Sequence, residues 1–286
     1  MKNLILGLCS FCLSLSSFAA SPVWKISKGD NHFYLGGTIH LLAESDYPLP
    51  NAFEQAYREA STLVFETDIE QMKASGNQTQ LLRKLLYPSG ESLRQKLSTE
   101  TYQRLDNFFA ARGVPTNQIT RFRIGMTVMT LTLIELRRNG LAEEGVDMFF
   151  MDKAKQDQKG VESLEELNAH MDFIANMGEG QEDEMIRQTL DDLEEIPAMI
   201  RDMKAAWRSG DNARLVEIGI REWKSEFPNV FKRLLTDRNN DWMTELANYN
   251  DDADVEFVLV GALHLVGEDG LLQQLQASGH QLEQLP

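Results

Sequence analysis

Two histidines near opposite ends of the chain share the same local sequence context. The segment Gly37-Thr38-Ile39-His40 follows a short aromatic and apolar run, and Gly261-Ala262-Leu263-His264 follows a longer apolar run at residues 255–260. The repetition is informative because histidine is scarce, with 5 in 286 residues. A glycine before each histidine lets the backbone turn sharply and approach other groups closely. Two imidazoles combined with carboxylates form a common donor set for a catalytic divalent metal ion.

Two glutamates follow other β-prone runs in the same way. Glu66 comes directly after the run at 62–65, and Glu165 comes after the run at 160–164. Ligands of open α/β sheets collect beyond the carboxyl ends of the strands, so the two histidines and the two glutamates are expected at one edge. A metal ion held there would lower the pKa of water and supply a nucleophile. A lone Gly-x-x-His is also compatible with a histidine that caps a loop, so spacing alone leaves the shared site open.

Several other kinds of active site have no support in the sequence. No His-Glu-x-x-His or Gly-x-Ser-x-Gly segment occurs, which argues against a helical zinc-peptidase motif and a serine nucleophile elbow. Gly178-Glu179-Gly180 has no third glycine and no phosphate-loop lysine, so nucleotide binding is not indicated.

The elements that must position these residues follow from hydrophobic periodicity and turn signals. Asn51 is the expected N-cap of the first helix, and the continuously apolar helix at 124–136 is expected to be buried. The expected strands lie at residues 23–27, 33–36, 62–65, 160–164, 255–260 and near 281–282, and the expected helices at 50–60, 124–136, 144–155, several positions within 181–248, and 269–277.

This order of elements predicts an α/β fold of mixed α+β character. A central mixed sheet is expected from the N- and C-terminal segments, with a large helical insertion at about residues 70–250. Residues 21–286 contain no low-complexity linker, so a single domain is expected there.

The first 20 residues are typical of a secretory signal peptide. Lys2 precedes an apolar stretch that ends in the small residues Ala19 and Ala20, and the stretch is too short for a comfortable membrane span. We therefore expect a periplasmic or secreted protein with no stable membrane insertion after signal removal; an uncleaved anchor is the alternative. Both cysteines, Cys9 and Cys12, lie in this segment, so the exported chain would have neither a disulfide nor a thiol nucleophile.

The chain is strongly acidic, with 28 basic and 44 acidic residues and a formal net charge of −16. Such a surface repels nucleic acid, so no nucleic-acid partner is expected. The charge itself is most simply explained by solubility. The sequence leaves the oligomeric state open.

Taken together in their order, the motifs of this chain resemble the TraB/GumN family, which is related to PrgY and to the animal Tiki proteins. The resemblance covers nearly all of the chain after residue 20. It rests on the segments Val23-Trp24-Lys25, Tyr34 to His40, Val64 to Asp68, Gly145-Val146-Asp147, Leu164-Glu165, Ala206 to Asp211, Arg238-Asn239 with Trp242-Met243, Val260 to Leu265, and Gly267 to Leu272.

The resemblance implies a fold similar to those of erythromycin esterases and ChaN. Tiki members are regarded as metal-dependent peptidases that use paired Gly-x-x-His motifs and a glutamate. The implied activity is that of an exported metal-dependent hydrolase, most simply a peptidase acting on an exported peptide or protein. Carried over by motif, His40, Glu66 and His264 would hold a divalent ion such as manganese, cobalt or zinc, with Glu66 as ligand or general base.

Further residues would assist under the same resemblance. Glu165 would support the site either as a second base or by holding a metal ligand in place, and Arg238 and Asn239 match a family Arg-Asn pair. The Arg238 guanidinium would hold a carboxylate in place or stabilise an oxyanion, and a purely structural ion pair is the alternative.

The chain also departs from the family pattern. His170 follows Ser163-Leu164-Glu165-Glu166 where the family often has a glutamine, and it is expected to be a partly exposed helix residue, with an added ligand as the alternative. Arg123-Ile124-Gly125 replaces a Lys-Pro-Trp segment, which puts the pocket wall in doubt. His32 and His280 are expected to be exposed to solvent.

Two other functions remain open. On the same fold, the protein would bind and sequester a peptide, a pheromone-like signal or haem without turnover. A metal-bound structural site with a scaffold role is the third alternative, although structural sites tend to be closed by protein ligands.

Overall fold

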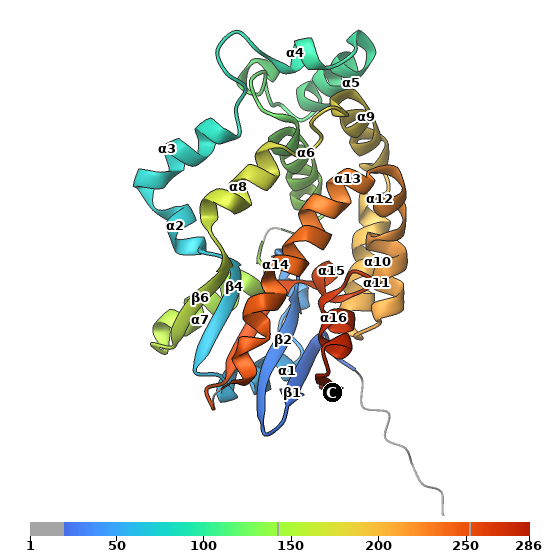
Figure 1. The fold of residues 1–286 in the computed structure, drawn as a ribbon. Coiled ribbons are helices and arrows are strands. Elements are labelled where there is room, and N and C mark those ends of the chain that lie inside the picture. Colours follow the sequence, from blue (N-terminus) through green and yellow to red (C-terminus); the bar gives the residue numbers. More distant parts are fainter. Residues whose placement is uncertain (1–19, 142, 252) are drawn as a thin grey trace, which may run out of the picture.

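A six-stranded mixed sheet lies at the centre of the fold, with strand order β6-β4-β7-β2-β1-β8 (Figure 1). The structure is a computed structural model and describes residues 20–141, 143–251 and 253–286; apart from Ala20, the expected signal peptide lies outside them. β6, β4, β7 and β2 run parallel, whereas β1 is antiparallel to both β2 and β8. The strands are β1 (Val23–Lys28), β2 (Asn31–Thr38), β4 (Thr62–Thr67), β6 (Gly160–Glu165), β7 (Glu256–Gly261) and β8 (Gln281–Gln284). The predicted mixed α/β class is thus confirmed.

The strand order explains the hydrophobic pattern of the sequence. β4 and β7 are interior strands with nearly continuous buried residues, because parallel strands covered on both faces have no solvent side. The hairpin of β1 and β2 turns at Gly29, whose φ of +65° favours glycine. A short antiparallel pair, β3 (Leu41–Leu42) and β5 (Glu143–Glu144), lies outside the main sheet.

Helices cover the sheet on both faces. In Figure 1, α14 crosses the sheet on the side facing the viewer and α1 lies behind it. Phe53 of α1 and Phe150 of α7 both contact Phe257 of β7, with ring centroids 6.1 and 5.8 Å away. The helices nearest the sheet are α1 (Asn51–Glu59), α7 (Val146–Gln156), α14 (Asp237–Leu246), α15 (Ala262–Leu265) and α16 (Leu271–Ala277).

The remaining helices form a second region, drawn in the upper part and along the right of Figure 1. Side chains of α5, α6 and α9 form a hydrophobic cluster of their own, distinct from the cluster around the sheet. β6 comes from within the expected insertion yet pairs with β4, so this insertion also contributes to the sheet. These helices are α2 (Ile69–Lys73), α3 (Ser75–Lys84), α4 (Leu93–Lys96), α5 (Thr99–Ala110), α6 (Ile124–Arg138), α8 (Leu167–Ala175), α9 (Glu182–Asp192), α10 (Ile196–Arg208), α11 (Asn212–Gly219), α12 (Arg221–Glu226) and α13 (Pro228–Phe231). Shorter 3-10 turns lie at Glu44–Asp46, Thr116–Gln118 and Asn248–Asn250, and a π-helical turn lies at Lys232–Thr236.

Four local expectations were wrong. Asn51 is the first residue of α1 rather than its cap, because Pro50 occupies the cap position and makes no side-chain cap bond. α6 is only partly buried, since it lies at the edge of its cluster and leaves Met129 45% exposed. His280 is buried beneath the turn between α16 and β8, where its Nδ1 lies 3.1 Å from the Leu275 carbonyl. His32 is partly buried by β-sheet neighbours rather than fully exposed.

None of the helices in the described part of the chain combines the length and the apolar composition that a membrane crossing needs.

Candidate active site

The carboxyl ends of the four parallel strands lie side by side at one edge of the sheet. Thr38 at the end of β2 pairs with Gly261 at the end of β7, and Thr67 at the end of β4 pairs with Glu165 at the end of β6. β4 and β7 are themselves neighbours, so the four ends are contiguous. The predicted site residues that these strand ends bring to the edge are His40, Glu66, Glu165 and His264.

Glu66 is buried at the middle of this edge. Its Oε1 accepts the Gly261 N–H at 2.6 Å, and its Oε2 accepts from Arg238 Nη2 at 2.5 Å. Burial alone would raise the pKa of Glu66, but His264, which is protonated at the acidic pH where Glu66 titrates, and the Arg238 guanidinium outweigh it and hold the pKa well below its ordinary value. Glu66 is therefore an ionised, fully hydrogen-bonded carboxylate at neutral pH.

Arg238 joins the two glutamates from the opposite side. The guanidinium donates to Glu66 and, through Nε and Nη2, to both oxygens of Glu165 at 3.0 and 2.7 Å. It lies over the Trp242 ring, 4.7 Å from the centroid, and Nη1 donates to the Leu234 carbonyl at 3.2 Å. The π-helical turn directly before α14 precedes Arg238, a feature often found at functional sites. With only 6% of the residue exposed, this arginine holds both carboxylates in fixed positions.

His170 lies against Glu165 and adds a further polar side chain to the site, next to the end of β6. Its Nδ1 is 2.5 Å from Glu165 Oε1 and 3.4 Å from Arg238 Nη2. The residue is on a helix and partly exposed, as expected, but it contacts the site. Potential ligand atoms of Glu66, Glu165 and His170 all lie within 4.8 Å of one another. These three residues are therefore a second possible donor set.

His264 is buried and its tautomer is determined by Asn239. The Asn239 amide nitrogen donates to the carbonyls of His264 and Asp269, at 3.0 and 2.8 Å, so the amide oxygen must face the ring. That oxygen lies 2.6 Å from His264 Nδ1, which therefore carries the proton. Nε2 is left with a lone pair and accepts from Arg238 Nη1 at 3.2 Å. Burial lowers the pKa of His264 to about 4, so the ring is neutral at pH 7.

His40 is exposed and has a carboxylate partner instead. Its Nδ1 lies 2.8 Å from Asp147 Oδ2, and the other oxygen of Asp147 accepts from the Thr38 hydroxyl at 2.8 Å. The charge of Asp147, together with this hydrogen bond, raises the pKa of His40 to about 9. The side chain is 69% exposed, so its Nε2 is available to a ligand from solvent.

Gly145 allows Asp147 to approach His40. A Cβ at position 145 would lie 2.2 Å from the Ile39 carbonyl oxygen, so only glycine fits against this loop. The adjoining Val146 N–H donates to the same carbonyl at 3.1 Å. The start of α7 is thereby fixed to the loop after β2, with Asp147 under the imidazole.

The three residues predicted to hold a metal surround Gly261. A Cβ at this position would lie 3.2 Å from Glu66 Oε1, 3.6 Å from His264 Cδ2 and 4.0 Å from His40 Nε2. A partner side chain holds the Nδ1 atom of each histidine, Asp147 for His40 and Asn239 for His264, so Nε2 is the atom that could bind a metal ion. Histidine ligands of metal ions are usually supported in this way.

Within the described residues, the potential ligand atoms of His40, Glu66 and His264 do not lie within 4.8 Å of one another as those of Glu66, Glu165 and His170 do, and Arg238 contacts both Glu66 and His264. The residue types suit a divalent ion such as zinc, manganese or cobalt, but holding it with His40, Glu66 and His264 would require these side chains to move closer together and Arg238 to give up its two contacts.

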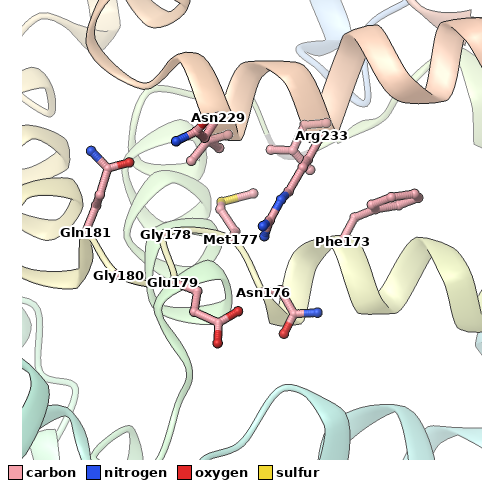
Figure 2. A pocket seen from close by; sticks show the side chains of 11 residues that line it. Phe173, Asn176, Met177, Gly178, Glu179, Gly180, Gln181, Asn229 and Arg233 are labelled. Carbon is pink, nitrogen blue, oxygen red and sulfur yellow. The ribbon is translucent and has the colours of Figure 1, made fainter.

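A cavity of about 230 Å³ lies next to the site, between the end of α8 and α13 with the π-helical turn. Figure 2 shows Arg233 reaching into it from one side, with Asn176 and Phe173 on the α8 side. Phe173 and Leu234 line this cavity and also contact Arg238. The Phe173 ring and the Leu234 backbone therefore connect the cavity lining to Arg238.

Asp147 was missed as a site residue in the sequence. Its Gly-Val-Asp segment belongs to the family resemblance, but 107 residues separate it from His40 and nothing local links them. The available signal was a glycine at a helix start followed two residues later by a carboxylate. Gly145 lies against the loop of Ile39 and His40, and Asp147 is in the first turn of the helix that begins there.

Comparisons with known proteins agree with one another. The sequence profile of the TraB/PrgY/gumN family matches residues 22–284. The chain is similar to "Uncharacterized protein YbaP" of Escherichia coli (strain K12), with 28% identity over 262 residues that cover 87% of this chain and 89% of the relative. The protein of the same name from Shigella flexneri gives the same identity and coverage. No solved structure matches the chain significantly.

Proposed function

Because the chain belongs to the TraB/PrgY/gumN family, as the match over residues 22–284 shows, we propose that it is a metal-dependent hydrolase of peptides or proteins. The observation that supports this proposal best is the convergence of His40, Glu66 and His264 around Gly261. His40 and His264 would hold the ion through Nε2, with Glu66 as the third ligand. The bound ion would polarise the scissile carbonyl and make water a stronger nucleophile.

Three side chains around the metal ligands would have separate roles in the reaction. Arg238 keeps Glu66 and Glu165 ionised and in place, which supports the carboxylate-holding role. Glu165 and Glu66 accept hydrogen bonds from the same Arg238 guanidinium. Once released from Arg238, Glu165 would accept the proton of the attacking water. Asn239 fixes the tautomer that leaves Nε2 of His264 unprotonated, so that this nitrogen would bind a ligand once Arg238 Nη1 releases it. Its role is to position this histidine.

We further propose that the protein is exported to the periplasm or secreted, as its signal-like first 20 residues favour. The substrate would then be an exported peptide or protein.

Metal binding is the first test. Titration of purified protein with manganese, cobalt or zinc by calorimetry should show one strong site, and His40→Ala and His264→Ala should each weaken it by about 100-fold or more. His32→Ala, a histidine outside the site, is the matched control and should bind as wild type. Equal affinity of wild type and the double variant would overturn the metal site.

Turnover is the second test. Metal-loaded protein is incubated with a peptide library, and cleavage is followed by mass spectrometry. Glu66→Gln should abolish cleavage, whereas Glu100→Gln, an exposed acid on α5, should not. Cleavage that persists in Glu66→Gln would refute an essential Glu66. Peptides that are retained intact would instead favour the sequestering alternative.

A further inference from the structure

A groove runs along the helical region at a distance from the strand ends. It lies among α6, α9, α10, α11 and α12, which are grouped on the right of Figure 1. Its volume is about 870 Å³, compared with about 230 Å³ for the cavity beside Arg233. A volume of this size is in the range of binding sites for ligands rather than of packing defects.

The floor of the groove is apolar and adaptable. Trp223 and Phe227 line it together with Met185 and Met199, and Met199 is 39% exposed. Methionine side chains are flexible and polarisable, so they suit surfaces that receive apolar side chains of varied shape. Met185 and Phe227 are themselves buried, so the accessible apolar surface of the groove centres on Met199 and the half-buried Trp223.

The rim of the groove is acidic. The carboxylates that line it are Asp192, Glu194, Glu195, Asp202, Glu217 and Glu222. Arg214 is the one basic residue in this lining, and it is already paired with Asp202 at 3.1 Å and Glu217 at 2.8 Å. Burial, with a contribution from Glu222 and its neighbours, raises the pKa of Asp192, as expected for crowded negative charge.

We propose that this groove binds a basic amphipathic helix of a partner protein, whose apolar face packs on the floor and whose lysines and arginines meet the acidic rim. An amphipathic helix in a groove is a recurrent recognition mode with apolar anchors at helical spacing. Charge complementarity selects the occupant: an acidic helix would be repelled, and a second copy of this chain would bring a net charge of −16.

The groove is continuous with the neighbourhood of the candidate active site. Met177, Val230 and Leu234 line both the groove and the cavity shown in Figure 2. The Leu234 carbonyl in turn accepts from Arg238. A helix in the groove therefore places the adjoining segment of the same partner near the site. The groove requires neither a metal ion nor turnover, so this inference stands if the hydrolase proposal fails.

The experiment measures binding of a labelled lysine–leucine amphipathic peptide of about 18 residues, long enough to form a helix. Fluorescence anisotropy is recorded with the Glu66→Gln protein, which keeps the peptide intact if the protein is a hydrolase. The triple variant Glu194→Gln, Glu195→Gln, Glu222→Gln should bind about tenfold more weakly, and added salt should reduce this difference. Met199→Asp should also weaken binding by about tenfold, because it puts a charge on the apolar floor.

Two controls separate the groove from the general acidity of the surface. The triple variant Asp30→Asn, Glu100→Gln, Glu162→Gln removes as many exposed acids outside the groove and should bind within about twofold of its parent. A peptide with glutamate in place of lysine should not bind. Equal weakening by the two triple variants, unchanged binding of Met199→Asp, or equal binding of both peptides would overturn the proposal.

Discussion

The two Gly-x-x-His segments have the same sequence pattern but opposite environments. His40 is exposed and its Nδ1 faces a carboxylate, Asp147, whereas His264 is buried and its Nδ1 faces an amide, Asn239. The pKa of His40 is raised to about 9, and that of His264 is lowered to about 4.

This difference shows that the tetrapeptide supplies an imidazole at a strand end, whereas burial sets the protonation of His264 and the charge of Asp147 sets that of His40. At pH 7 and without a metal ion, His40 is cationic and His264 is neutral. A metal ion would have to displace a proton from His40 but not from His264, so its binding should release about one proton at this pH.

The largest effect is expected at Arg238, which contacts the buried histidine and not the exposed one. Arg238→Met would leave Glu66 and Glu165 buried without their shared cation, so the free energy of unfolding should fall by about 3–5 kcal/mol. Urea denaturation at pH 7 measures this change. Arg233→Met, which removes an exposed arginine from the preceding turn, should cost less than about 0.5 kcal/mol. Similar losses in the two variants would contradict the proposed holding role.

A smaller effect is expected from the protonation of His264. Because its folded pKa lies below the unfolded value of about 6.5, the unfolded state binds the extra proton, and stability is lost as the pH falls from about 6.5 through 4. His264→Gln should reduce the metal-free protein's stability loss over this window by on the order of 2 kcal/mol. Glu66, whose pKa is also depressed, adds to the loss only at the acidic end of this window, as the pH approaches its unfolded value of about 4.5. Parallel stability curves for wild type and variant would argue against a neutral buried ring.

The smallest effect concerns His40 and has the opposite sign. Its raised pKa contributes stability that is fully present below the unfolded pKa of about 6.5 and is lost as the pH rises through about 9. Solvent screening keeps this contribution below about 1 kcal/mol. Asp147→Asn should remove it and lower the pKa of His40 towards its ordinary value, which NMR titration of the imidazole would show. An unchanged His40 pKa would mean that Asp147 does not set its charge.

The order of elements was predictable because it depends on local patterns. Apolar runs of strand length marked β4 and β7, and the N-cap of α11 is also local, since Asp211 accepts from the Arg214 N–H three residues on. The errors arose where neighbours outside the segment decide the outcome. The burial of His280 and the exposure of Met129 depend on which elements pack against them, and local pattern carries no such information.

The sequence by itself determined that two histidines follow strands and two glutamates lie at strand ends, and that the ordered motifs are those of the TraB/PrgY/gumN family. Only the tertiary structure decided that Asp147, Asn239 and Arg238 surround them, since these contacts join residues from 25 to 172 positions apart. The physical reason is that protonation depends on burial and on the nearest charges, and both are fixed by the packing of α7 and α14 against the strand ends. The same two tetrapeptides therefore end as one cationic and one neutral imidazole.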